Sequence, residues 1–118
     1  MRNKYLESDQ AKAVEPFDSA EEAWFWYCRC EQMENARPLN SNFTKVRPCE
    51  TSDIFIALKR LFQRGLLRPA HLKVLSKYGY AQVPPHPHFG DSSKICSLWQ
   101  EALNFLGFSL KKKGIVVA

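Results

Sequence analysis

The sequence predicts an all-α protein, a compact bundle of about four main helices with two long loops. Apolar residues recur at helical spacing in four stretches, which begin at capping residues and end near glycines. No stretch alternates apolar and polar residues as a strand would, apart from the short tail GIVVA. With 118 residues, of which 45% are apolar, the chain suits one domain with its own core.

The first helix is expected from about Ser19 to Glu34. Ser19 and Glu22 fit the S-x-x-E capping box, and acidic residues suit the positive end of the helix dipole. Residues 1–16 are polar and aperiodic, so we predict a flexible N-terminal arm, which leaves 17–118 as a single helical domain. Residues 35–50 predict a long loop.

The stretch AWFWYCRC, residues 23–30, admits several interpretations: a core helix, a platform for stacking bases, a metal or redox site, or a membrane segment. Trp24 and Tyr27 share one helical face, while Trp26 and Met33 lie on another. A helix that is apolar on two faces belongs in a core. The stretch is also too short to cross a membrane.

Two further helices follow the predicted loop. Thr51 or Ser52 is expected to cap the second, and Gly65 to stop it. Pro69 suits the first turn of the third, and Gly79 is expected to end it. The predicted apolar positions are Ile54, Leu58, Leu61, Phe62, Leu72, Leu75 and Tyr78.

The last helix is expected after a proline-broken connector, with Asp91 or Ser92 as its cap. Gly107 is expected to kink or end it, and the lysine run before Gly114 suits a helix C-terminus. The predicted apolar face comprises Ile95, Leu98, Trp99, Ala102, Phe105 and Leu106.

Charge is divided unevenly along the chain, whose net charge is +5. Residues 1–58 hold 7 Lys and Arg against 10 Asp and Glu, a net of −3, whereas residues 59–118 hold 10 against 2, a net of +8. A basic half of this kind suggests a polyanion partner, most often nucleic acid. The alternative is a solubilising surface, or one that pairs with the acidic half.

The basic side chains of the second and third helices should turn outward, because the apolar residues turn inward. Together with Lys59 they would form one basic surface able to contact phosphates. The candidate phosphate contacts are Arg60, Arg64, Arg68, Lys73 and Lys77, with Lys111, Lys112 and Lys113 as a further clamp.

The polar face of the last helix resembles that of a recognition helix. It carries Lys94, Gln100 and Asn104, which are residue types that read base edges. The segment from Gly79 to Asp91 is much longer than a helix-turn-helix turn, so a standard motif is absent. An atypical helix-turn-helix-like arrangement and an ordinary solvated helix face both stay open.

The four cysteines are expected to be reduced thiols of a cytoplasmic protein, because the start of the chain has no secretory signal and no segment suits a membrane. Cys28 and Cys30 point in nearly opposite directions on a helix and cannot grip one metal ion. A metal site assembled from Cys49, Cys96, His86 and His88 is required by no spacing, so neither metal nor cofactor is predicted.

Catalytic constellations are not evident in the sequence. His86 and His88 lie near Asp91 in a proline-rich loop, where we expect the histidines to face solvent. His71 is interpreted as a partly buried packing residue. The best reactive-thiol candidate is Cys49, since Arg47 and a helix start lie close in sequence. We therefore predict a protein that is not an enzyme.

The blocks SAEEAWFW, RPCETSDI, LWQEALNFL and KKKGIV together resemble a family of small, uncharacterised alphaproteobacterial proteins. The resemblance spans about Phe17 to Val117, and the NSNFTKV and HPH segments are not part of it. No activity is established for that family, so the resemblance implies a bacterial cytoplasmic protein and assigns no functional residue.

Three functions follow, in order of preference. The first is a small, non-catalytic nucleic-acid-binding or transcription-regulatory protein. The second is an interaction adaptor whose basic half meets an acidic protein, with Phe89 or Tyr80 as anchors. The third is an enzyme or redox protein that uses Cys49. The sequence leaves the oligomeric state open.

Overall fold

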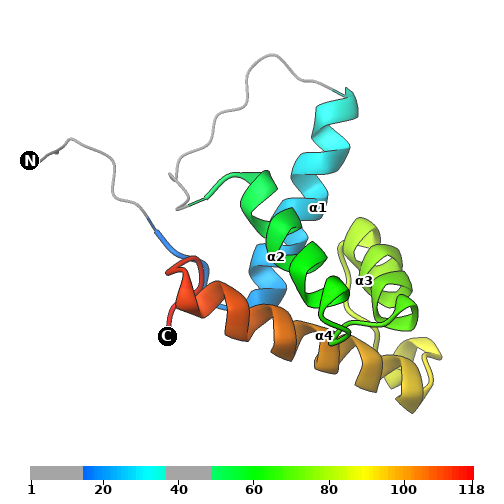
Figure 1. The fold of residues 1–118 in the computed structure, drawn as a ribbon. Coiled ribbons are helices and arrows are strands. Elements are labelled where there is room, and N and C mark those ends of the chain that lie inside the picture. The colour runs from blue at the N-terminus through cyan, green and yellow to red at the C-terminus, as the bar shows by residue number, and fades with distance from the viewer. Residues whose placement is uncertain (1–14, 37–48) are drawn as a thin grey trace, which may run out of the picture.

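A computed structural model describes residues 15–36 and 49–118 of the chain and confirms the all-α bundle (Figure 1). Within those ranges the helices are α1 (Ala20–Ala36), α2 (Thr51–Gln63), α3 (Pro69–Ala81) and α4 (Ser93–Lys112), with a short 3-10 helix, η1 (Pro87–Phe89), before α4. The predicted arm, except for its last two residues, and most of the predicted first loop lie outside the described residues.

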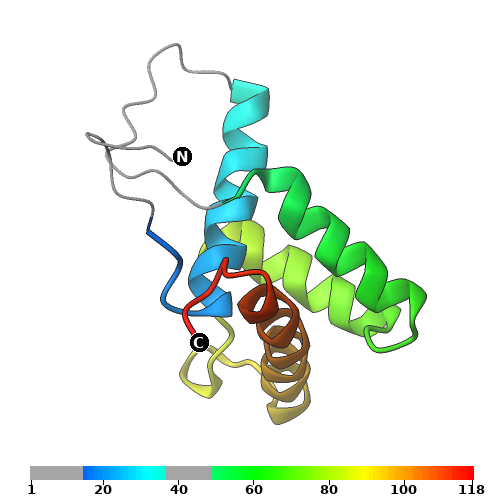
Figure 2. The same ribbon diagram turned by 60° about the vertical axis from the view of Figure 1, so that its left-hand side comes forward.

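α4 is the helix against which the other three pack, and α1 packs on α2 and α3 as well. Figures 1 and 2 show α1 standing across α4, and Figure 1 shows α3 beside the first half of α4. The residues just before α1 meet those after α4: Phe17 and Val116 form an isolated parallel bridge, with the Phe17 N–H donating to Ile115 O at 2.9 Å. The predicted tail strand is thus a single bridge.

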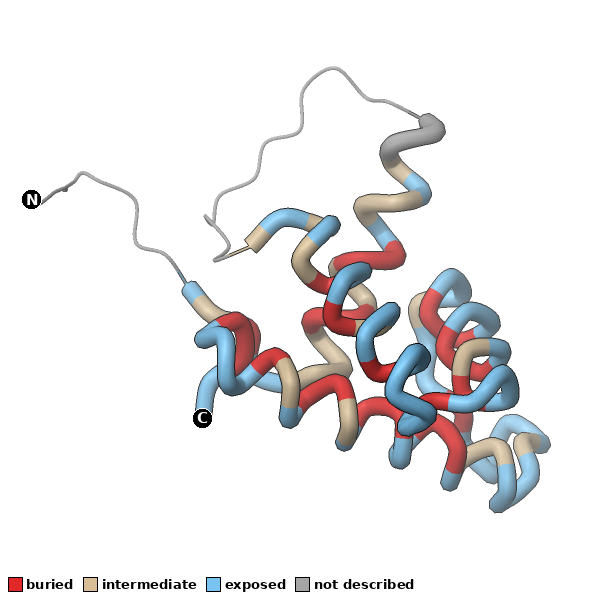
Figure 3. The backbone as a smooth tube through the Cα atoms, in the orientation of Figure 1, coloured by how far each residue is buried: buried red, intermediate tan, exposed pale blue. Residues whose placement is uncertain are grey.

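α1 supplies the centre of the core through one of its two predicted apolar faces, while Trp26 and Met33 of the other face are only half-buried. Trp24, Tyr27 and Cys28 are buried, and the buried positions of all four helices face one another (Figure 3). The Trp24 indole N–H donates to the Leu75 carbonyl of α3 at 2.9 Å, so the buried polar atom has a partner. The interpretation of AWFWYCRC as structural rather than functional agrees with this burial.

The predicted helix starts are largely confirmed. Ser19 Oγ accepts from the Glu22 N–H at 3.1 Å, and Ser92 Oγ accepts from the Ile95 N–H at 3.2 Å. The expectation that Thr51 or Ser52 caps α2 is wrong. Glu50 is the N-cap, and its N–H donates to the Asp53 carboxylate at 2.8 Å, which places both predicted caps inside the helix.

Two glycines that were expected to end or kink helices lie inside them. Gly79 is buried in α3, where an added Cβ would lie 2.5 Å from both Cys28 Sγ and Trp24 Nε1. Gly107 lies inside α4, where an added Cβ would lie 3.2 Å from Ala20 Cβ. Both glycines therefore allow helices to approach closely. By contrast Gly65 has a φ of 81° and follows α2, as predicted.

Phe62 is also corrected, because it is 42% exposed and does not belong to the core. α2 directs Ile54, Ala57 and Leu61 inward, and Phe62 follows Leu61 by one residue, about 100° around the helix. Phe55 and Ile56 are exposed on α2 as well. The outer surface of α2 is therefore partly apolar.

Candidate nucleic-acid interface

The cations of the basic half lie on the surface of the protein. All ten lysines and arginines of residues 59–118 are exposed. Within residues 15–36 and 49–118 none of them lies within ion-pair distance of a carboxylate. The positive charge that the sequence concentrates in this half is thus presented to solvent.

The two acids of this half are bonded to other groups. Asp91 accepts from the Tyr78 hydroxyl and from the His86 N–H at 2.9 Å, and Glu101 bonds to His71 at 2.9 Å. The hydrogen bond from Tyr78, then that from the His86 backbone, lowers the pKa of Asp91. The charge of Lys77 also lowers the pKa of Asp91, but no lysine or arginine of this half forms an ion pair with either acid in the described residues.

The predicted phosphate contacts fall into groups around α4. Lys73 and Lys77 line a hollow of about 460 Å³ with Asp91 and Ser92 at the start of α4. Arg68 lines a second hollow, of about 600 Å³, with Glu101 and Asn104. Arg60 is exposed on α2, and Arg64 is its C-cap.

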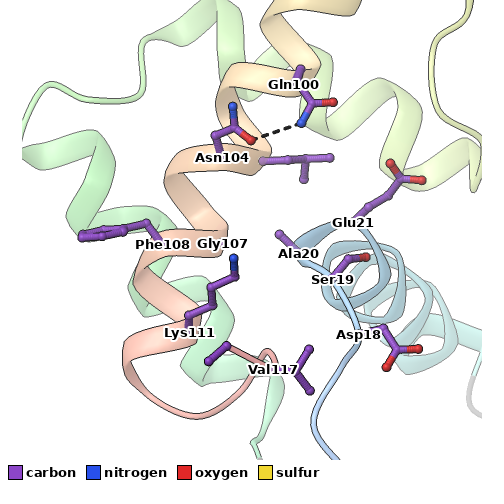
Figure 4. A pocket seen from close by; sticks show the side chains of 12 residues that line it. Asp18, Ser19, Ala20, Glu21, Gln100, Asn104, Gly107, Phe108, Lys111 and Val117 are labelled. Carbon is purple, nitrogen blue, oxygen red and sulfur yellow. Dashed lines mark hydrogen bonds between the residues drawn. The ribbon is translucent and has the colours of Figure 1, made fainter.

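The predicted base readers do not all come together. Gln100 and Asn104 lie one turn apart, and the Gln100 amide N–H donates to Asn104 Oδ1 at 3.1 Å. Both line a third hollow, of about 580 Å³, together with Lys111 (Figure 4). Lys94 precedes Gln100 by six residues, about 9 Å along α4 and about 240° around it, so it lies on a different side of the helix. Lys112 and Lys113 are exposed at the end of α4.

His71 is more deeply buried than its interpretation as a partly buried packing residue implied, with 2% of its surface exposed. Its Nδ1 accepts from the Arg68 N–H at 3.0 Å, and its Nε2 lies 2.9 Å from the Glu101 carboxylate. These two bonds favour the Nε2–H tautomer and occupy both ring nitrogens. His71 therefore ties the start of α3 to α4 and has no nitrogen left to act as a base.

Sequence reasoning missed Phe108, which is 66% exposed on α4. It follows Asn104 by four residues, so the two share a helix face, and it lines the same hollow as Gln100 and Asn104. The ammonium group of Lys112 lies 4.8 Å from the centre of its ring. The i, i+4 spacing from Asn104 was the signal that could have identified it.

The thiols and loop histidines do not assemble into a metal site in the described part of the chain, where no group of three or more candidate ligands is found. None of the four cysteines forms a disulfide. Burial, followed by the charge of Glu31, raises the pKa of Cys28 to about 12, which makes it unreactive. His86 and His88 are exposed, as predicted.

Cys49 is half-buried beside the N-cap Glu50 and packs against the core. Arg47, which motivated the reactive-thiol hypothesis, lies outside the described residues. The hypothesis therefore stays a prediction.

Comparison of the chain with family models, curated proteins and solved structures finds no match. The resemblance to an alphaproteobacterial family thus stays a prediction. No helix in the described ranges is long and apolar enough to span a membrane.

Proposed function

We propose that this chain is a small, non-catalytic nucleic-acid-binding protein of the regulatory type. The observation that carries the proposal is the exposure of all ten lysines and arginines of residues 59–118, while both acids of that half are bonded to other groups. Cations that are free of carboxylate partners are suited to displace the counterions of a nucleic acid.

The interface that we propose is built around α4. Arg60, Arg64 and Arg68 lie along α2 and the turn that follows it, and Arg68 shares a hollow with Asn104 of α4. Lys73 and Lys77 extend the cations toward the start of α4, and the lysine run extends them from its end. Phosphate contacts of this kind position a nucleic acid and supply most of its affinity.

Titration of labelled oligonucleotides at several salt concentrations tests the proposal. When the logarithm of the binding constant is plotted against the logarithm of the salt concentration, each phosphate contact contributes about −0.9 to the slope on a duplex and about −0.7 on a single strand. The double variant Arg64→Gln/Arg68→Gln should make this slope shallower by the contribution of about two phosphate contacts. The control, Arg29→Gln on α1, removes an exposed cation of the acidic half and should leave the slope unchanged. Absence of binding at low salt would overturn the proposal.

An adaptor that binds an acidic protein is the second candidate, favoured by the exposed apolar side chains on α2. Phe55 and Phe62 lie seven residues apart, on nearly the same side of the helix, and Lys59 and Arg60 lie between them. Such a mixture of apolar and cationic groups suits an acidic amphipathic segment.

Affinity capture with and without nuclease separates the two candidates. A bound protein that survives nuclease treatment, and is lost with Phe55→Ser/Phe62→Ser but not with Phe89→Ser, would favour the adaptor. Loss of every captured partner on nuclease treatment would favour nucleic acid. Phe89, an anchor expected from the sequence, is exposed in η1 away from α2, so a partner that is retained by Phe89→Ser and lost with the α2 variant is bound through α2 instead.

A further inference from the structure

The hollow between the start of α1 and the second half of α4 has walls of contrasting chemistry (Figure 4). Its volume is about 580 Å³, and the last residues of the chain close one side. Asp18 and Glu21 lie on the α1 wall and Asn104 and Lys111 on the α4 wall, while the Phe108 ring lies at the outer rim of α4 and points away from α1. An acidic wall repels phosphate but accepts hydrogen bonds from amino groups, such as those of nucleobases.

Phe108 supplies an aromatic surface at the edge of this hollow. Two thirds of its side chain is exposed, although apolar burial would stabilise the fold. The Lys112 ammonium group already lies over the ring. An exposed ring beside a cation is the pairing on which bases of single-stranded nucleic acids stack, with the cation close to the phosphates.

The Gln100–Asn104 pair supplies hydrogen-bonding groups to the same hollow. Because the Gln100 N–H donates to Asn104 Oδ1, the pair retains the Gln100 oxygen as an acceptor and the Asn104 nitrogen as a donor. No other hydrogen bond of these two amides is found in the described ranges. An adjacent donor and acceptor match the edge of an unpaired base.

We propose that the α4 rim of this hollow, beside Phe108, receives an unstacked base of a single-stranded nucleic acid, an inference that rests on the proposed function. The base stacks on Phe108 and is bonded by the amide pair, while Lys111 and Lys112 contact the flanking phosphates. Asn104 lines both this hollow and the one that holds Arg68, so the strand has a path across α4 toward that arginine. In a duplex the base faces are already stacked, so none is available to Phe108.

Binding of one fluorescent oligonucleotide, offered as a single strand and as its duplex, tests the inference by anisotropy. Phe108→Ala should weaken single-strand binding by about ten- to a hundredfold, the usual loss of one base–aromatic stack. Phe89→Ala, which removes an exposed ring in η1, should have no effect, and Phe108→Trp should restore binding. Phe108 is exposed, so circular dichroism should confirm that its variants stay folded.

Each outcome decides between the two proposals. Equal affinities for single strand and duplex, with Phe108→Ala matching Phe89→Ala, overturn the base site but leave phosphate binding in place. A single-strand preference lost specifically with Phe108→Ala supports both. No binding of either form at low salt overturns both.

Discussion

α1 and the outer face of α4 display their side chains in opposite ways. α1 has the residues that draw attention in the sequence, with aromatic side chains beside two thiols, yet it turns Trp24, Tyr27 and Cys28 inward. α4 presents an ordinary amphipathic pattern, yet it turns Gln100, Asn104 and Phe108 to solvent beside a hollow. The direction of a side chain relative to the core therefore separates structural from candidate functional residues better than its type.

Truncation of Trp24 should produce the largest effect. Trp24→Ala removes a buried indole and its hydrogen bond to Leu75, and loss of a buried tryptophan costs about 3–5 kcal/mol. That loss is comparable with the stability of a small domain, so the variant should be largely unfolded. Urea titration followed by far-UV circular dichroism measures it. A Trp24→Ala variant that stays folded but has lost nucleic-acid binding would instead indicate that α1 is part of the nucleic-acid interface.

Thiol labelling tests the burial of α1 without a mutation. Because the pKa of Cys28 is raised to about 12, its thiolate fraction at pH 8 is lower by about a thousandfold than that of a thiol at the ordinary value near 8.5. Cys30, Cys49 and Cys96 are half-buried and should all be modified before Cys28. Mass spectrometry after alkylation identifies the modified sites, and early modification of Cys28 in the folded protein would contradict its burial.

The same labelling, repeated across pH, tests the Cys49 hypothesis. A thiol activated for redox chemistry has an apparent pKa well below about 8.5. A value near 8.5 would remove the reason for assigning Cys49 a reactive role.

Gly79→Ala should destabilise the fold by about 1–2 kcal/mol. Alanine favours a helix over glycine by about 1 kcal/mol, but here its Cβ would lie 2.5 Å from Cys28 Sγ and Trp24 Nε1. Overpacking of a core costs about 1–3 kcal/mol, so the clash outweighs the gain in propensity. Ser76→Ala, at an exposed position of α3, is the control and should be neutral or slightly stabilising. Thermal unfolding compares the two; a stabilised Gly79→Ala would show that α1 and α3 can separate.

The sequence predicted the features that depend on residues close together in the chain. Caps such as Ser19 and Ser92, the stop at Gly65 and the inward faces of the helices follow from local chemistry and the helical period. The Glu50 cap was missed because Thr51 and Ser52 offered stronger candidates one residue away. Local signals thus fixed the number and type of elements and left their ends uncertain by a residue or two.

The sequence could not predict the features that depend on contacts between helices. Gly79 is needed because α3 touches Trp24, which lies 55 residues away in a sequence of 118. The hollow beside Phe108 exists because the start of α1 and the end of the chain meet next to α4. The exposure of the basic residues was predicted from the helical period, but the hollows that Arg68, Lys73, Lys77 and Lys111 line could be found only from the packing.

The contact between Asp91 and Tyr78, which joins α3 to the connector before α4, should give the smallest effect, because it is a single hydrogen bond to a carboxylate that is only partly buried. The hydrogen bond from Tyr78 lowers the pKa of Asp91, so the folded state binds the proton less tightly than the unfolded state, whose value is about 3.9. The stabilisation is therefore present above about pH 4 and is lost as the pH falls toward the lowered pKa.

Asp91→Asn isolates this contribution. The wild-type protein should be more stable than the variant near pH 7, where the carboxylate accepts from both Tyr78 and the His86 N–H, and the difference should shrink as the pH falls below 4. At high pH the titrating group is Tyr78, whose pKa is raised by its hydrogen bond to Asp91. The stability difference between wild type and variant should therefore also shrink as the tyrosine ionises above about pH 10. Urea unfolding of both proteins at several pH values measures the decrease at low pH and the decrease at high pH. A difference that stays constant from pH 7 to pH 3 would show that Asp91 does not hold the start of α4 through its charge, and that the acid is available to oppose phosphate instead.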